Sequence, residues 1–77
     1  MELIDIYEAA RRRGIARSKR DFSTTLLRKA PNYLADRGWG GCSVGALLNL
    51  YRSLGERGQV DLQAAAFRRL LDAGARP

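Results

Sequence analysis

The sequence predicts an all-α fold, a compact bundle of about five short helices in a single domain over residues 1–77. Apolar side chains recur at intervals of three and four residues, as they do along one face of a helix, and no segment alternates with a period of two. Residues that cap or end helices, mainly serine, aspartate and glycine, separate these apolar stretches. A hydrophobic fraction of 45% and a charged fraction of 29% are typical of a folded domain and argue against disorder.

The first helix is predicted over residues 2–13. Its apolar stripe consists of residues at helical spacing: Leu3, Ile6, Tyr7 and Ala10. Acidic residues lie early in this segment and Arg11–Arg13 lie late, an order that complements the helix dipole. Gly14 follows as the expected C-cap, because glycine tolerates the left-handed conformation common at helix ends.

The second helix is expected to begin at Ser18, an N-cap residue, with Asp21 three residues later as its capping-box partner. Its inward stripe is Phe22, Leu26 and Leu27. Arg28–Ala30 is the predicted turn. The pattern of two short helices around this turn is the outline of a helix-turn-helix.

A short third helix is predicted to begin at Pro31, because proline is favoured at the first helical position, where its missing N–H costs nothing. Tyr33 and Leu34 are its apolar residues, with Tyr33 expected in the core, and Gly38 ends it. Residues 38–42 form a loop, since three glycines within it make a regular element costly.

Ser43 is the predicted N-cap of a fourth helix that runs to about Leu54. A turn over Gly55–Gly58 leads to a fifth helix, which Asp61 caps and which continues through about Ala73. The apolar stripe of the fourth helix is Val44, Leu47, Leu48, Tyr51 and Leu54. That of the fifth is Leu62, Ala66, Phe67, Leu70 and Leu71.

Positive charge is concentrated in one part of the chain. The net charge is +6 at pH 7, and residues 11–29 hold eight arginines and lysines against Asp21 alone, which gives +7. The remaining residues therefore sum to −1. A concentrated cationic surface attracts polyanions, and phosphate binding releases counterions. The charge therefore points to nucleic acid, although a solvated face or an acidic protein partner also fits it.

Three stretches resemble the phage-repressor type of helix-turn-helix domain, a family of five helices whose second and third helices form the reading unit. They are the start of the second helix (Ser18, Arg20, Asp21, Phe22 and Ser23), Pro31–Leu34, and the fourth-helix string Ser43–Leu54. The signatures Arg20–Ser23 and Pro31–Leu34 are also similar to those of small proteins of proteobacteria and their mobile elements. The resemblance covers about residues 3–71, and it implies a small transcriptional regulator that binds duplex DNA.

Under this hypothesis, the helix-turn-helix and the basic segment 11–29 bind the DNA. Phosphate contacts are expected from cations before and within the turn: Arg17, Lys19, Arg20, Arg28 and Lys29. Asn32 could pair with adenine and Arg37 with guanine. Each also has a structural interpretation, because Asn32 can bond the helix start and Arg37 can complement the helix C-terminus. A two-fold homodimer would place half-sites about 34–36 Å apart.

The alternative is a protein-interaction module on a degenerate helix-turn-helix, such as an antiactivator or a phage-type inhibitor. The turn offers Leu27–Lys29 where the family has glycine, and Asp36 on the third helix would repel phosphate. Trp39, in the glycine-rich loop, either plugs the core or anchors a partner. Phe67 and Leu71 on the fifth helix are further candidates for a protein interface, including that of a homodimer.

The residue types offer no catalytic or metal site, so neither enzyme activity nor a cofactor is expected. Histidine is absent, and one cysteine and eight carboxylates show no ligand spacing. A helical domain of this size is expected to leave little room for a small-molecule pocket. The lone Cys42 cannot form an internal disulfide, which favours a reducing cytoplasm. No stretch is apolar enough for a signal peptide or a membrane span.

Overall fold

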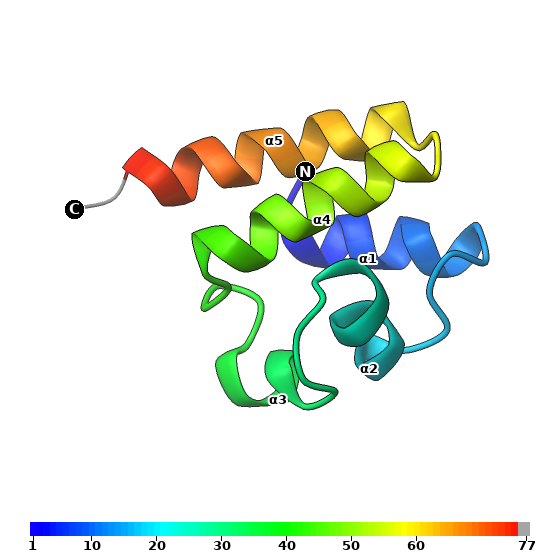
Figure 1. Ribbon diagram of the computed structural model, residues 1–77, viewed down its shortest axis with the longest axis horizontal. Coiled ribbons are helices and arrows are strands. Elements are labelled where there is room, and N and C mark those ends of the chain that lie inside the picture. Colours follow the sequence, from blue (N-terminus) through cyan, green and yellow to red (C-terminus); the bar gives the residue numbers. More distant parts are fainter. Residues whose placement is uncertain (76–77) are drawn as a thin grey trace.

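The helices are arranged in three layers, which Figure 1 shows from top to bottom. The upper layer is α5 (Val60–Ala75), the middle layer is α1 (Leu3–Arg12) with α4 (Val44–Glu56), and the lower layer holds α2 (Lys19–Asp21) and α3 (Tyr33–Arg37). The computed structural model describes the backbone of residues 1–75 and the side chains of residues 1–74. No strand occurs among these residues, so the predicted all-α class is confirmed.

A π-helical segment, η1 (Phe22–Leu26), continues α2 without a break, so that α2–η1 is one helix and the described chain has five helices. Consecutive hydroxyl residues explain the wider turn. The hydroxyls of Ser23 and Thr24 donate to backbone carbonyls one turn earlier, at 2.9 and 3.2 Å. Such back-bonding occupies oxygens of the α-helical ladder and loosens it. The Leu27 N–H accordingly reaches back five residues to the Phe22 carbonyl, at 3.1 Å.

The core contains the predicted stripes of the first two helices. All of their members are buried: Leu3, Ile6, Tyr7, Ala10, Phe22, Leu26 and Leu27. The predicted stripe of the fourth helix is partly wrong, since Leu50 is fully buried whereas Val44 is 47% exposed. The reason is that α4 packs against both α5 and η1, which shifts its buried face. On α5, the outer part of the predicted stripe, Phe67 and Leu71, faces solvent.

Three helices end in the same kind of turn, a Schellman-type closure with a left-handed residue just after the helix. Gly14 follows α1 at φ 73° and Gly58 follows α4 at φ 70°. The third closure follows η1, but its left-handed residue is Arg28, at φ 55°. The Lys29 N–H completes it by bonding the Ser23 carbonyl at 2.9 Å. Arg28 thus occupies a position that glycine fills at the other two ends.

Glycine at position 28 is therefore expected to be more stable than alanine there, by about 1 kcal/mol, which reverses their usual order in helices. The left-handed conformation crowds the Cβ atom of alanine, whereas glycine lacks it. Both variants remove the arginine side chain, so the comparison isolates the backbone. Urea unfolding of Arg28→Gly and Arg28→Ala measures the difference, and equal or greater stability of the alanine variant would argue against a left-handed residue 28.

The predicted break between the second and third helices is too short. Residues 27–32 all lie outside the helices, because the closure at Arg28 is followed by a second turn. That turn is fixed by a 3.0 Å bond from the Tyr33 N–H to the Ala30 carbonyl. Pro31 lies within it, so α3 begins at Tyr33 rather than at Pro31.

The predicted cap at Asp61 is also wrong, because α4 continues to Glu56 and α5 already begins at Val60. Asp61 instead joins α5 to the end of α1. Its carboxylate accepts two bonds from the Arg13 guanidinium, at 2.9 and 2.6 Å. These bonds lower the pKa of Asp61 to about 2 and raise the pKa of Arg13.

This ion pair predicts a loss of stability in acid. The pKa of Asp61 is about 2 in the folded protein, against 3.8 as its ordinary value. Because the folded value is the lower one, the pair stabilises the fold fully above the ordinary pKa and loses its effect as the pH falls through about 2. Asp61→Asn should be less stable than the parent at neutral pH, with a difference that shrinks across this window. Thermal unfolding followed by circular dichroism tests this, and a difference that stays constant with pH would contradict it.

Candidate nucleic-acid interface

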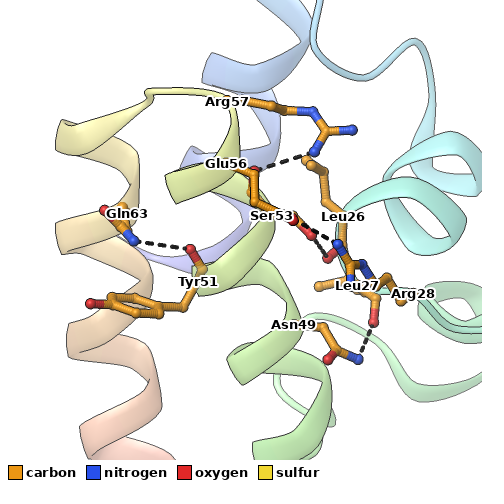
Figure 2. Close-up of polar contacts among 9 residues, drawn as sticks. All are labelled: Leu26, Leu27, Arg28, Asn49, Tyr51, Ser53, Glu56, Arg57 and Gln63. Atoms are coloured by element: carbon orange, nitrogen blue, oxygen red, sulfur yellow. Dashed lines mark hydrogen bonds and ion pairs between the residues drawn. The ribbon is translucent and has the colours of Figure 1, made fainter.

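Polar side chains of α4 hold the turn between the second and third helices (Figure 2). Three contacts form this clamp: Asn49 to the Leu27 carbonyl (2.9 Å), Ser53 to the Leu26 carbonyl (3.1 Å), and the Arg28 guanidinium to Glu56 (2.7 Å). The α4 members are spaced four and three residues apart, so they share one face of the helix. The clamp satisfies carbonyls that the end of η1 leaves free, and it fixes the turn against the core.

The loop after α3 is anchored by its tryptophan. The ring centroid of Trp39 lies 5.2 Å from that of Tyr7 and 6.4 Å from that of Phe22, so the ring fills the edge of the core. The Lys19 ammonium lies 5.5 Å from the centre of the same ring. Lys19 is the first residue of α2, and Trp39 follows α3. This cation–π contact therefore brings the start of α2 beside the end of α3.

Helix α3 is attached to the fold along one side. Leu34 is buried, and the Tyr33 hydroxyl accepts the Ser43 backbone N–H at 2.9 Å. Ser43 is the N-cap of α4, as predicted, so this bond ties the starts of α3 and α4 together. Asn32 and Asp36 are exposed, and the Asn32 amide donates to the Asp36 carboxylate at 2.8 Å.

Four of the sequence-predicted cations belong to the two segments that meet here, α2 with the residues before it and α3. Lys19 and Arg20 begin α2, Arg17 precedes its N-cap Ser18, and Arg37 is the last residue of α3. All four are exposed, and none forms an ion pair with another described residue. These four residues are called the basic face below.

The other two cations lie apart from the basic face, at the far end of α2–η1. Arg28 is neutralised by Glu56 in the clamp. Lys29 is half-buried. The structure therefore does not bring all the predicted phosphate contacts together, because the turn uses Arg28 for its own attachment to α4.

Asp21 lies among the cations of the basic face. Its carboxylate accepts the Arg17 backbone N–H at 2.8 Å and the Thr25 hydroxyl at 2.9 Å. These bonds, with the charges of Arg17 and Arg57, lower the pKa of Asp21. The predicted N-cap is confirmed, since the Ser18 hydroxyl accepts the Asp21 N–H at 3.2 Å. The predicted return bond is shifted by one residue, to the N–H of Arg17 instead of Ser18.

Sequence reasoning missed four residues of this region. Asn49, Ser53 and Glu56 form the clamp, and Arg57 adds its charge near Asp21. Polar residues at this helical spacing within a leucine-rich segment are a signal that could have identified the clamp. No local signal identifies Arg57, because its position depends on how α4 packs against η1.

A cleft of about 300 Å³ opens beside Trp39, between the start of α1, the loop before α4 and the end of α5. This volume lies at the lower limit of small-molecule sites. Its cation, Arg69, is already paired with Glu2 and Asp72, at 3.4 and 2.7 Å. Burial raises the pKa of the Cys42 thiol, which lines the cleft, and this disfavours a reactive thiolate.

Within residues 1–75, no group of three or more potential ligands is placed to hold a metal ion. None of the described helices is long and apolar enough to cross a membrane. Comparisons with family models, with curated proteins and with solved structures give no match. The function is therefore argued from the chemistry of the surface around α2 and α3.

Proposed function

We propose that this protein is a small cytoplasmic DNA-binding regulator, and that its basic face contacts the phosphate backbone of duplex DNA. The observation that carries the proposal is a set of four exposed cations, without ion-pair partners among the described residues, on two segments that meet at the Lys19–Trp39 contact. Arginine binds phosphate through a planar fork of donors, and lysine binds it as a point charge. Contacts of this kind fix the position and orientation of a protein on a duplex.

The arrangement around the basic face supports a rigid platform. The clamp from α4 holds the turn, and Trp39 holds the loop that follows α3. The bond between the Tyr33 hydroxyl and the Ser43 N–H also holds the start of α3, so both ends of this short helix are attached to the rest of the fold. A preorganised surface loses little conformational entropy when it binds, which favours affinity.

Base reading by α3 is proposed to be limited. The helix has five residues, about 7.5 Å at the usual rise, and so can span few base pairs. The Asn32 amide must leave the Asp36 carboxylate before it can pair with adenine. Asp36 itself opposes phosphate, although it can accept a bond from the amine of cytosine. We therefore expect binding that depends mainly on the backbone and shows modest sequence preference.

A salt titration tests this function. Fluorescence anisotropy with a labelled duplex should show binding at low salt that weakens with a log–log slope of about −3 to −4, as expected for four phosphate contacts. No binding at low salt, or binding without a salt slope, would contradict the proposal.

A second candidate is the protein-interaction module. It is favoured by the exposed Asp36, because a carboxylate on a helix that faces DNA repels the phosphates. It would be supported if the protein bound no duplex at low salt but retained a protein partner on purification from cell extract. Loss of that partner on changing Asp36 to lysine would place the contact on α3.

A further inference from the structure

Helix α5 carries a second apolar stripe on its solvent side. Val60, Phe67 and Leu71 are 71%, 45% and 55% exposed, and Ala64 is exposed between them. Their spacing of four, three and four residues is that of alternating core positions in a coiled coil. Leu62 and Ala66, which are buried in the core, lie on the opposite side of the helix. Of the stripe residues, Phe67 also contacts the Tyr51 ring of α4, with centroids 5.9 Å apart, and the rest of its ring stays exposed.

We propose that a second copy of this chain covers the stripe, with the two α5 helices antiparallel. In that arrangement Ala64 of one copy lies opposite Phe67 of the other, and Val60 lies opposite Leu71. Each larger side chain therefore meets a smaller one, as well-packed helix interfaces require. A parallel pair would set Phe67 against Phe67 and Ala64 against Ala64, which crowds one layer and leaves a gap in the next.

The charges beside the stripe favour the same orientation. Asp61 and Arg68 follow Val60 and Phe67 directly in sequence, so they lie on one flank of the stripe. An antiparallel pair brings Asp61 of each copy near Arg68 of the other. A parallel pair would instead place Asp61 and Arg68 of each copy beside the neutral flank of the other, which Gln63 and Leu70 form. The Asp61 side chain remains 64% exposed despite its pairing with Arg13, so it is accessible to a second arginine.

The proposed contact is short, and this sets its strength. The stripe from Val60 to Leu71 is about 17 Å long at 1.5 Å per residue. Interfaces of this kind lie at the small end of specific contacts, so we expect a dissociation constant on the order of tens of micromolar.

The dimer has a consequence for DNA binding by the basic face. This consequence rests on the proposed function, whereas the dimer itself does not. Helix α5 lies on the side of the molecule opposite α2 and α3 (Figure 1). Pairing through α5 therefore directs the two basic faces away from each other. They would contact two separate duplex segments, not neighbouring half-sites about 34–36 Å apart on one duplex.

Sedimentation equilibrium of the 77-residue chain, from micromolar to near-millimolar concentration, tests the dimer. We expect a reversible monomer–dimer equilibrium that Phe67→Asp weakens by at least about 30-fold, as for a central interface residue. Val44→Asp is the matched control, because Val44 is 47% exposed, close to Phe67, but lies on α4. It should leave the equilibrium unchanged, and circular dichroism should show that both variants are folded. A parent chain that stays monomeric throughout, or equal weakening by both variants, would overturn the proposal.

Cysteine cross-linking tests the orientation, in a Cys42→Ser background. Val60→Cys combined with Leu71→Cys should form an intermolecular disulfide readily, because the two positions lie opposite each other in the antiparallel pair. Leu71→Cys alone should cross-link slowly. If it cross-links as fast as the double variant, the helices are parallel and the proposed arrangement is wrong.

Discussion

Replacing Phe22 with alanine is expected to leave most of the protein unfolded at room temperature. Phe22 is fully buried, and its ring meets that of Tyr7 edge-on, with centroids 5.4 Å apart. It also supports Trp39, which anchors the loop after α3. Removing a buried phenylalanine ring costs about 3–5 kcal/mol, whereas a core of this size supplies only a few kcal/mol of net stability.

Circular dichroism and the fluorescence of Trp39, the only tryptophan, measure this loss. Phe67→Ala is the matched control, because Phe67 is the other phenylalanine and is 45% exposed. In dilute solution it should cost about 1 kcal/mol or less. Phe22→Leu keeps most of the buried volume and should give a folded but weakened protein. A cooperative transition of Phe22→Ala near that of the parent would show that Phe22 does not lie at the centre of the core.

Reversing two charges of the basic face is expected to weaken DNA binding by about 100-fold and to reduce the salt slope by about 2. The double variant is Lys19→Glu with Arg20→Glu. Both positions lie in the first turn of α2, where acidic residues complement the helix dipole. The variant loses the Lys19–Trp39 contact, so circular dichroism and Trp39 fluorescence check that it stays folded. The loss of binding is attributed to two phosphate contacts, each of which contributes about 0.9 to the slope.

Arg52→Glu with Arg68→Glu is the matched control, because it changes the net charge equally at two exposed arginines of α4 and α5. It should weaken binding much less and leave the slope nearly unchanged. Fluorescence anisotropy with the same duplex measures both variants, at protein concentrations well below the dissociation constant expected for the α5 dimer, because Arg68 lies in that contact. Equal losses would mean that DNA responds to the overall charge of the protein and that the basic face is not its site.

The sequence predicts the elements that depend on local patterns. The stripe of α1 and the caps at Ser18 and Ser43 follow from helical spacing and from the hydroxyl groups that helix starts favour, and all are found in the structure. The glycine at position 14 also takes the left-handed conformation expected after a helix.

Features that depend on tertiary contacts are not predicted. Arg28 takes a left-handed conformation without being glycine, because the clamp from α4 holds the turn around it. The rotation of α4 follows from its packing on two neighbours, which no single-helix pattern records. The residue type of Asp61 predicts a helix cap, but its carboxylate binds Arg13, which is 48 residues away in the chain.

The candidate site is partly predictable for the same reason. The sequence identifies the cations but not which of them are free, because the pairing of Arg28 with Glu56 joins residues 28 positions apart. It also leaves two roles open for Trp39, and packing against Tyr7 and Phe22 supports the first of them, closure of the core.

The most direct test of DNA binding through the basic face is an amide chemical-shift map, recorded by NMR as a short duplex is added at low salt. Shifts should gather at residues 17–20 and 37–39, where α2 and α3 meet, and residues 60–74 of α5 should be unaffected. Shifts concentrated on α5, or none at all with saturating duplex, would contradict the proposed interface.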